Sequence, residues 1–582
     1  MPSVAAHYYS RSVTSVRSIF RSSEAAVIAL AVGVGLAAGL VTMLIHRMAH
    51  GLQSLVYGIG TSSLSATSVI SPGRLLALPI GGLLLGLGSR AAIRRWRKPV
   101  DIVEANALHG GMIPWRDTAL VCVQTILSNG VGASVGLEAA YGQAGGGIAS
   151  VVGDWLKLRR ADLRTLVGAG AGAAIGAAFS APLAGAFYAF EIVLGAYTPA
   201  AIAPVGAACI SAVLLVRLLG FEAYLTALPG ARAITTIDYL LYAGLGILCA
   251  GVAIGIMRAV TWIEARVRSL PVADAYRPAI GGIFVIPLAM VTPQALSAGH
   301  GALHLDLGAE VAVRFLLVVL CIKIAASSIS LGFGFRGGLF FASLFIGSLV
   351  GQLFCGAAAH VSGLPPLDPS DAALIGMAAM GVAIIGAPMT MSMLVLETTH
   401  DFALTSVALV AGLCASTVVR ETFGFSFSTW RLHTRGENIR SARDVGWVRN
   451  LTAGRMMQRS PDTIAPTATV AEFRRRFPLG STGRVVVADV AGRYLGIVET
   501  TRAFDPQLDV DAEIGMLTST EDPTLSPEDD VRSVMLAFDQ SDAPYLAVID
   551  INGTVLGTLS ERFVRRRYAE EVEKAQRDLF GE

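Results

Sequence analysis

The residue best placed to do chemistry in this sequence is a glutamate that follows a glycine-rich stretch. Glu138 comes directly after Gly136 and Leu137, inside an apolar segment. A glycine-rich loop that opens onto a helix exposes unpaired backbone N–H groups and the positive end of the helix dipole, which together bind anions. A carboxylate there would compete with an anion, and its protonation would release the site. An intramembrane acid is a functional residue by default, and a plain helix N-terminal interaction is the alternative.

A second glycine-rich stretch has the same character. It ends at Gly338 and continues through Leu339 and Phe340 into another apolar segment. It predicts a second helix N-terminus whose backbone N–H groups could contact the anion. The glycines of the two stretches correspond in order: Gly130, Gly132 and Gly136 in the first, and Gly332, Gly334 and Gly338 in the second.

The two stretches belong to an internal repeat. The interval from Pro182 to Glu191 is identical to the interval from Pro388 to Glu397. Duplicated halves with interrupted helices at matching positions are typical of transporters, whose sites lie at the repeat interface. Chance recurrence of small residues in an apolar chain is the weaker explanation, because two motifs occur in the same order.

The elements that position these residues must be membrane helices. The chain has 582 residues and is 53% hydrophobic but only 15% charged, whereas soluble domains average about 25% charged. A spanning helix needs about 20 apolar residues, and the segments that qualify are 25–46, 75–94, 201–219, 236–262, 277–296, 311–331 and 403–420. Other apolar runs are shorter or interrupted by glycine, which is tolerated where helices line a cavity: 117–128, 138–152, 163–178, 183–196, 338–355, 372–386 and 387–399.

The charge distribution suggests the topology and the domain boundaries. Arginines precede the first apolar run, so the positive-inside rule places residues 1–24 in the cytoplasm. The membrane domain should span 25–435, and a linker should cover 436–448, since the sequence becomes charged and mixed after Arg431. Two soluble modules, 449–510 and 511–570, and a tail, 571–582, should complete the chain.

The composition also argues against several functions. A net charge of +2 provides no basic surface for nucleic acid. The six cysteines all lie in apolar segments without C-x-x-C spacing, so no metal site or disulfide framework is expected. No nucleophilic or metal-dependent catalytic group is visible, so we do not expect an enzyme.

The motifs resemble those of the CLC family of chloride channels and proton–chloride antiporters. Residues 136–143 (GLEAAYGQ) are similar to the family's GREGPxxQ, 336–342 (RGGLFFA) to GGxFxP, and 387–399 (APMTMSMLVLETT) to APLTG…LVLEMT. The resemblance covers about residues 25–435 and implies an inverted-repeat fold with broken helices. It also implies chloride transport by a homodimer in the cell's inner membrane, with one voltage-gated pathway per subunit. Glu138 would be the gate and the external proton acceptor.

Two positions that bind the anion in the family are altered here. Alignment of 100–105 with the family's P-E-x-x-E-A segment places Arg97 at the position of an anion-binding serine. Arg97 could hold an anion or narrow the pore; a basic cytoplasmic helix end is the equal alternative. Ser428 falls at the position of an anion-binding tyrosine, and its hydroxyl could still donate to chloride.

A third change concerns proton coupling. Antiporters of the family carry an internal proton-transferring glutamate at the position of Ile192, which cannot relay a proton. We therefore favour channel-like conduction. The alternatives are a proton-coupled antiporter with another internal route, a protein selective for a different anion such as nitrate or fluoride, and a membrane sensor with an inactive transport fold.

The C-terminal residues contain a duplicated pattern, in which the apolar runs 484–489 and 545–550 are followed by the glycine-containing runs 496–498 and 557–560. In this pattern they resemble a tandem pair of CBS modules. Alternating apolar strands joined to short amphipathic helices predict an α/β fold. CBS pairs often bind adenine nucleotides, but Arg502 and Phe563 stand where the ribose-binding acid would be expected. A ligand-free structural pair in the cytoplasm is therefore at least as well supported as a nucleotide site, and no other cofactor is expected.

Overall fold

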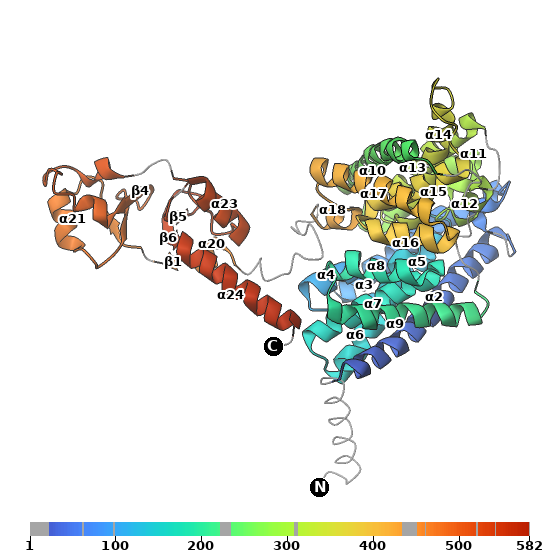
Figure 1. Cartoon of the computed structure of the whole chain (residues 1–582), viewed down its shortest axis with the longest axis horizontal. Helices are drawn as coiled ribbons and strands as arrows, with labels where there is room; N and C mark the ends of the chain where they lie inside the picture. The colour runs from blue at the N-terminus through green and yellow to red at the C-terminus, as the bar shows by residue number, and fades with distance from the viewer. Residues whose placement is uncertain are drawn as a thin grey trace, which may run out of the picture. The chain divides into compact units, whose positions relative to one another are not determined.

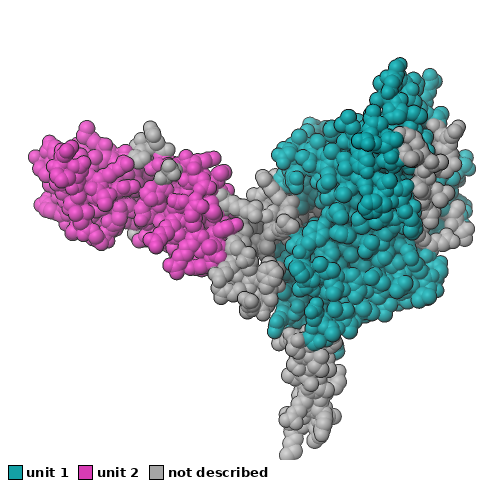
Figure 2. Space-filling model, in the orientation of Figure 1, with its two compact units in different colours: residues 1–444 teal, residues 445–582 magenta. Residues whose placement is uncertain are grey.

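The chain forms two compact units, residues 1–444 and 445–582 (Figure 2). The computed structural model describes residues 23–60, 63–96, 99–221, 234–307, 312–433, 451–459, 461–518, 522–541 and 543–580. The division between the units falls inside the predicted linker 436–448, which itself lies outside the described residues.

The first unit is built from apolar helices. Within the described residues, eight helical segments are long and apolar enough to cross a membrane. They are α2 (Glu24–Tyr57), η2 with α3 (Pro72–Leu76 and Ala77–Arg95), α9 (Pro199–Leu218), α10 (Thr236–Ser269), η4 with α11 (Asp274–Tyr276 and Arg277–Val291), α13 (Val313–Gly332), α14 (Phe340–Ala358) and α17 (Phe402–Thr422). Each of the seven predicted spans coincides with one of these segments, although the helix in 277–296 ends at Val291. The chain is a multi-pass membrane protein.

The prediction for 338–355 was wrong in one respect. We expected this run to be shorter than a span or interrupted by glycines, but α14 is a continuous helix of 19 residues. Its glycines allow α15 (Pro369–Ile385) to approach closely instead of breaking the helix, since a Cβ on Gly347 would collide with the carbonyl oxygen of Gly376. The runs 138–152 and 163–178, for which we expected the same, lie in the continuous helices α6 (Glu138–Leu156) and α7 (Arg160–Phe179).

Further helices complete this unit. Two of them, α8 (Pro182–Tyr188) and α16 (Pro388–Thr399), begin with proline, whose missing N–H costs nothing in the first turn. The others are η1 (Leu64–Ala66), α4 (Ile102–Leu108), α5 (Trp115–Gly130), α6 (Glu138–Leu156), α7 (Arg160–Phe179), the π-helical η3 (Ala189–Leu194), η5 (Pro293–Ala295), α12 (His300–Leu307) and α18 (Phe427–His433).

The predicted internal repeat is visible as two sets of helices. Both halves open with a helix of 34 residues, α2 and α10, and both contain a helix of 19 residues after the glycine-rich loop, α6 and α14. Helices α8 and α16, which carry the matching proline motifs, lie against each other where the halves meet (Figure 1). The repeat interface therefore runs through the segments that the motifs singled out.

The second unit is an α/β structure, as predicted. One sheet has the order β2-β3-β4 and the other β1-β6-β5. The strands are β1 (Gln458–Arg459), β2 (Thr463–Ile464), β3 (Arg484–Ala488), β4 (Tyr494–Glu499), β5 (Tyr545–Ile549) and β6 (Val555–Ser560). The helices are α20 (Ala453–Met456), α21 (Val470–Arg476), α22 (Thr500–Ala503), η6 (Ile514–Leu517), α23 (Val531–Ser541) and α24 (Glu561–Phe580).

The second unit is also a repeat, and the chain crosses between its halves. Strand β1, from the first predicted module, pairs with β6 of the second. Ile514, from the second predicted module, packs into the core around β3 and β4. Residues 571–580, which we expected to form a tail, continue helix α24. Each half therefore contributes residues to the other, so the two halves are not independent folding units.

Candidate functional site

Two glycine-rich loops meet at the centre of the first unit and pair with each other. The backbone N–H of Gly136 donates to the carbonyl of Gly338 at 2.9 Å, and the N–H of Gly338 donates back at 3.3 Å. This pairing brings the N-termini of α6 and α14 to one place, since α6 begins at Glu138 and α14 at Phe340. First-turn N–H groups have no intrahelical acceptor, so two positive helix ends converge here.

Serine side chains fix the two loops symmetrically. The N–H of Ser134 donates to Ser330 Oγ at 3.1 Å, and the N–H of Arg336 donates to Ser128 Oγ at 3.0 Å. The two bonds are equivalent under the repeat, because the spacing from Ser128 to Ser330 equals that from Ser134 to Arg336. Each half therefore holds the loop of the other.

The carboxylate of Glu138 lies between the paired loops. Its Oε1 accepts a hydrogen bond of 3.1 Å from the N–H of Phe341, in the first turn of α14. Its Oε2 is buried and has no hydrogen-bond partner among the described residues. A Cβ on Gly136 would collide with this carboxylate, and one on Gly338 would lie 3.1 Å from Oε2. The glycines thus leave just enough room for a negatively charged group.

A cavity of about 160 Å³ opens beside Glu138. It contains most of the residues predicted as a site, and its lining includes Glu138, Gly338, Leu339, Phe340 and Ile192. Gly136 and Leu137 flank it as the residues that lead into α6. A neighbouring cavity of about 390 Å³ is also lined by Ile192 and includes Glu191. Ile192 therefore stands at the boundary between two adjacent cavities.

The cavity also contains residues that the sequence did not single out as part of the site. Two arginines, Arg336 and Arg431, line it together with Tyr188 and the acidic residues Asp101 and Glu104. Arg336 directly precedes Gly337 and Gly338 in the sequence, so its place in the cavity lining could have been predicted from this proximity. Tyr188 stands one helical turn before Ile192, which was a weaker one.

Two further predicted contacts cannot be placed. Arg97 lies outside the described residues. Ser428 lies in the backbone of α18, between Phe427 and Arg431, which both line the cavity; its side chain is not described. The roles assigned to both residues stay predictions.

A buried polar network supports the loop behind Glu138. Gln53 Nε2 donates to Asn129 Oδ1 at 2.8 Å, and Asn129 Nδ2 donates to the carbonyl of Val135 at 2.8 Å. Ser297 Oγ accepts from both amides, and its carbonyl accepts from the fully buried Lys323 at 2.7 Å. Buried networks of this kind are rigid when their members are paired, so the loop is held from behind.

The proline motifs of the two halves are joined by hydrogen bonds, in which each half provides a carboxylate for a helix start in the other. Glu191 accepts from the N–H groups of Met389 and Thr390 at 3.0 and 2.9 Å, at the start of α16. Glu397 accepts from those of Leu183 and Ala184 at 2.8 and 2.9 Å, at the start of α8. Each acid thus caps the helix of the opposite half, which makes Glu191 a structural residue.

In the second unit, Arg484 lies between the two sheets. Its Nη2 donates to Thr558 Oγ1 at 2.7 Å and to Gln458 Oε1 at 3.1 Å, and its guanidinium lies 3.9 Å from the ring centroid of Tyr545. Protein side chains therefore occupy this part of the space between the modules.

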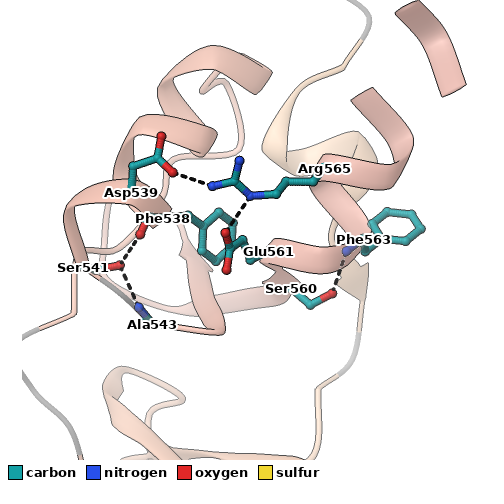
Figure 3. Close-up of polar contacts among 8 residues, drawn as sticks. All are labelled: Phe538, Asp539, Ser541, Ala543, Ser560, Glu561, Phe563 and Arg565. Carbon is teal, nitrogen blue, oxygen red and sulfur yellow. Dashed lines mark hydrogen bonds and ion pairs between the residues drawn. The ribbon is translucent and has the colours of Figure 1, made fainter. Parts of the chain in front are cut away.

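The two positions at which a ribose-binding acid was expected carry Arg502 and Phe563. Phe563, at the start of α24, is 48% exposed and donates its N–H to Ser560 Oγ (Figure 3). Next to it, Arg565 forms ion pairs with Asp539 and Glu561, which raise its pKa (Figure 3). Arg565 thus ties α24 to α23. Arg502 is exposed on α22.

Known proteins are similar to this chain in sequence and fold. The model of the voltage gated chloride channel family matches residues 76–420. A putative ClcB-like chloride channel protein from Ralstonia nicotianae is 31% identical over 389 residues, which cover 64% of this chain and 89% of that protein. The voltage-gated ClC-type chloride channel ClcB of Escherichia coli is 28% identical over 390 residues, covering 64% and 90%.

Solved structures agree on the fold. A slow cyanobacterial Cl⁻/H⁺ antiporter superposes with a TM-score of 0.62 at 24% identity, covering 70% of this chain and 97% of that one. A eukaryotic CLC transporter superposes with a TM-score of 0.57 at 18% identity, covering 92% and 97%. The family match covers more than half of the chain and includes both glycine-rich loops, Glu138 and both proline motifs. The chain is therefore a member of the voltage gated chloride channel (CLC) family.

Proposed function

We propose that this protein transports chloride or a similar small anion across the membrane, through the cavity beside Glu138. The observation that carries the proposal is the position of the Glu138 carboxylate. It occupies the point where two helix N-termini converge, with one oxygen on the N–H of Phe341 and the other buried without a described partner. A negatively charged group is thus already seated in an anion site.

The geometry suggests how the carboxylate would act as a gate. While Glu138 is ionised, it competes with an anion for the N–H groups of α14. Protonation removes the charge that these groups favour, so an anion replaces the carboxylate. Arg336 and Arg431, in the same cavity, add positive charge that favours anion entry, and Asp101 and Glu104 partly offset it.

We infer channel-like conduction over proton antiport from Ile192. This residue lines both cavities and offers no proton-accepting group. The alternative is antiport with another internal proton route, and Asp101 and Glu104 are the acids that favour it, since they share the cavity of Glu138. The Cl⁻/H⁺ antiporter among the solved structures shares the fold, which is compatible with either mode.

We also propose a homodimer in the inner membrane, with the second unit as a cytoplasmic pair of CBS modules. The repeat of that unit supports the pair, because Asp489 and Asp550 form equivalent turns. Each carboxylate accepts N–H groups from the residues that follow it, which lowers its pKa.

The test of the function follows chloride and protons in the same vesicles. The full chain is reconstituted, and chloride efflux and internal pH are recorded together over a range of external pH. We expect chloride efflux that increases at low pH, without uphill proton movement. Uphill proton movement would exclude the channel mode, and the absence of any flux at all pH values would favour the sensor alternative.

A further inference from the structure

The lining of the cavity beside Glu138 includes a tyrosine, Tyr188, whose hydroxyl has no described hydrogen-bond partner. Tyr188, the last residue of α8, lines the cavity with Glu138 and Ile192. Its ring packs edge-on against Phe340, with 6.5 Å between ring centroids and an interplanar angle of 76°. Its hydroxyl makes no hydrogen bond to any residue that the structure describes.

The hydroxyl lines the same cavity as the Glu138 carboxylate. A Cβ built on Gly142 would lie 3.8 Å from the oxygen of Tyr188. Gly142 is four residues after Glu138, so the two share one face of α6. The hydroxyl therefore lies along the face of α6 that carries Glu138, one turn further into the helix.

The internal repeat shows that this hydroxyl is not needed for packing. Tyr188 stands three residues before Glu191, and its counterpart three residues before Glu397 is Leu394, which is 1% exposed. An aliphatic side chain thus fills the equivalent place in the other half. The phenol adds a hydrogen-bond donor on the side of the cavity that contains Ile192, which has none.

We propose that the hydroxyl of Tyr188 donates a hydrogen bond to the transported anion and makes the site selective for small, strongly accepting anions. The inference rests on the proposed anion pathway and adds a ligand from α8 to the backbone N–H groups of α6 and α14. A neutral donor suits this place, since it holds an anion without adding a charge that would slow its release.

Equilibrium binding to the full-length protein in detergent tests the assignment. Chloride and thiocyanate affinities are measured by calorimetry for the wild type, for Tyr188→Phe and for a control, Tyr276→Phe, whose side chain is exposed in η4. A hydrogen bond to a charged group is worth enough for Tyr188→Phe to weaken chloride binding about tenfold to about a hundredfold. The affinity for thiocyanate, a weaker hydrogen-bond acceptor, should fall less than the affinity for chloride. The control Tyr276→Phe should keep the wild-type affinity for both anions. Unchanged chloride affinity in Tyr188→Phe overturns the proposal.

A proton relay is the competing role for a hydroxyl beside Glu138. That role predicts that Tyr188→Phe keeps its chloride affinity and alters only the proton movement in vesicles, a result that also overturns the proposal. Crystals of the wild-type protein in bromide provide a readout that does not depend on the variant. An anomalous peak within hydrogen-bonding distance of the Tyr188 hydroxyl supports the assignment, and a peak elsewhere in the cavity overturns it. The absence of bromide from the cavity would contradict the proposed anion pathway, and with it the role of the Tyr188 hydroxyl as an anion ligand.

Discussion

Glu191 and Glu397 cap each other's helices across the two halves of the membrane unit. Glu191 binds the start of α16, the helix that contains Glu397, and Glu397 binds the start of α8, the helix that leads to Glu191. Each carboxylate accepts two backbone N–H groups that would otherwise lack partners. The pair therefore joins the halves beside the cavity that Glu191 and Ile192 line, and it explains why the same proline-to-glutamate interval occurs twice.

This exchange predicts a loss of stability when either acid is neutralised. Glu191→Gln and Glu397→Gln should each lower the free energy of unfolding by about 2 kcal/mol, because a charged acceptor at a helix N-terminus is lost. Thermal unfolding in detergent, followed by size-exclusion recovery, measures the effect. Glu421→Gln, at an exposed position near the end of α17, is the matched control. Equal melting temperatures for all three variants would contradict a role of the exchange in stability.

Sequence reasoning could predict the repeat and the position of Glu138 beside the glycine-rich loops, but not the full lining of the cavity. Glu138 and the glycine-rich loops are local patterns, and the physics of helix N-termini makes their meaning readable from sequence alone. Tyr188 and Arg336 reach the cavity only because α8 and the second loop fold towards α6, and this depends on tertiary packing. The interval between Pro182 and Glu191 likewise revealed the repeat, but not which helix each acid would cap.

Neutralising Glu138 should open the pathway. In Glu138→Gln the amide cannot compete with an anion for the N–H of Phe341 as a carboxylate does, so chloride flux at neutral pH should increase about tenfold or more. The wild-type flux should rise as pH falls, because protonation removes the blocking charge, whereas the flux of the variant should not depend on pH. Chloride efflux from vesicles is measured at several pH values from about 4.5 to about 8, upward from the range in which a carboxylate ordinarily titrates. The pH profiles decide between a gate and a structural cap. Identical pH profiles for both proteins would exclude Glu138 as the gate.

The space around the carboxylate provides a second, steric test of the gate. In Gly136→Ala the new methyl group would collide with the Glu138 carboxylate, so the carboxylate should leave its site. Chloride flux should then approach that of Glu138→Gln and lose most of its pH dependence. Gly338→Ala is the matched control, because its Cβ would lie 3.1 Å from Oε2, a contact that a small shift relieves.

Removal of the carboxylate should abolish this effect of the methyl group. The double variant Gly136→Ala/Glu138→Gly should conduct like Glu138→Gly alone, since nothing remains for the methyl group to displace. A further change in flux on adding Gly136→Ala would mean that the methyl group acts on the loop backbone and not on the gate.

Arg484 should hold the two sheets of the second unit together. In Arg484→Met the aliphatic stem can still pack on Tyr545, but the hydrogen bonds to Thr558 and Gln458 are lost. The free energy of opening between the sheets should fall by about 1–2 kcal/mol. Hydrogen exchange of the full-length protein should therefore become faster in β3, β5 and β6, while the helices of the membrane unit keep their protection. Arg475→Met, on the surface helix α21, is the matched control. If both variants exchange like the wild type, the contacts of Arg484 do not hold the sheets together, and the pair depends on the apolar contact between Val486, Ile497 and Ala547 alone.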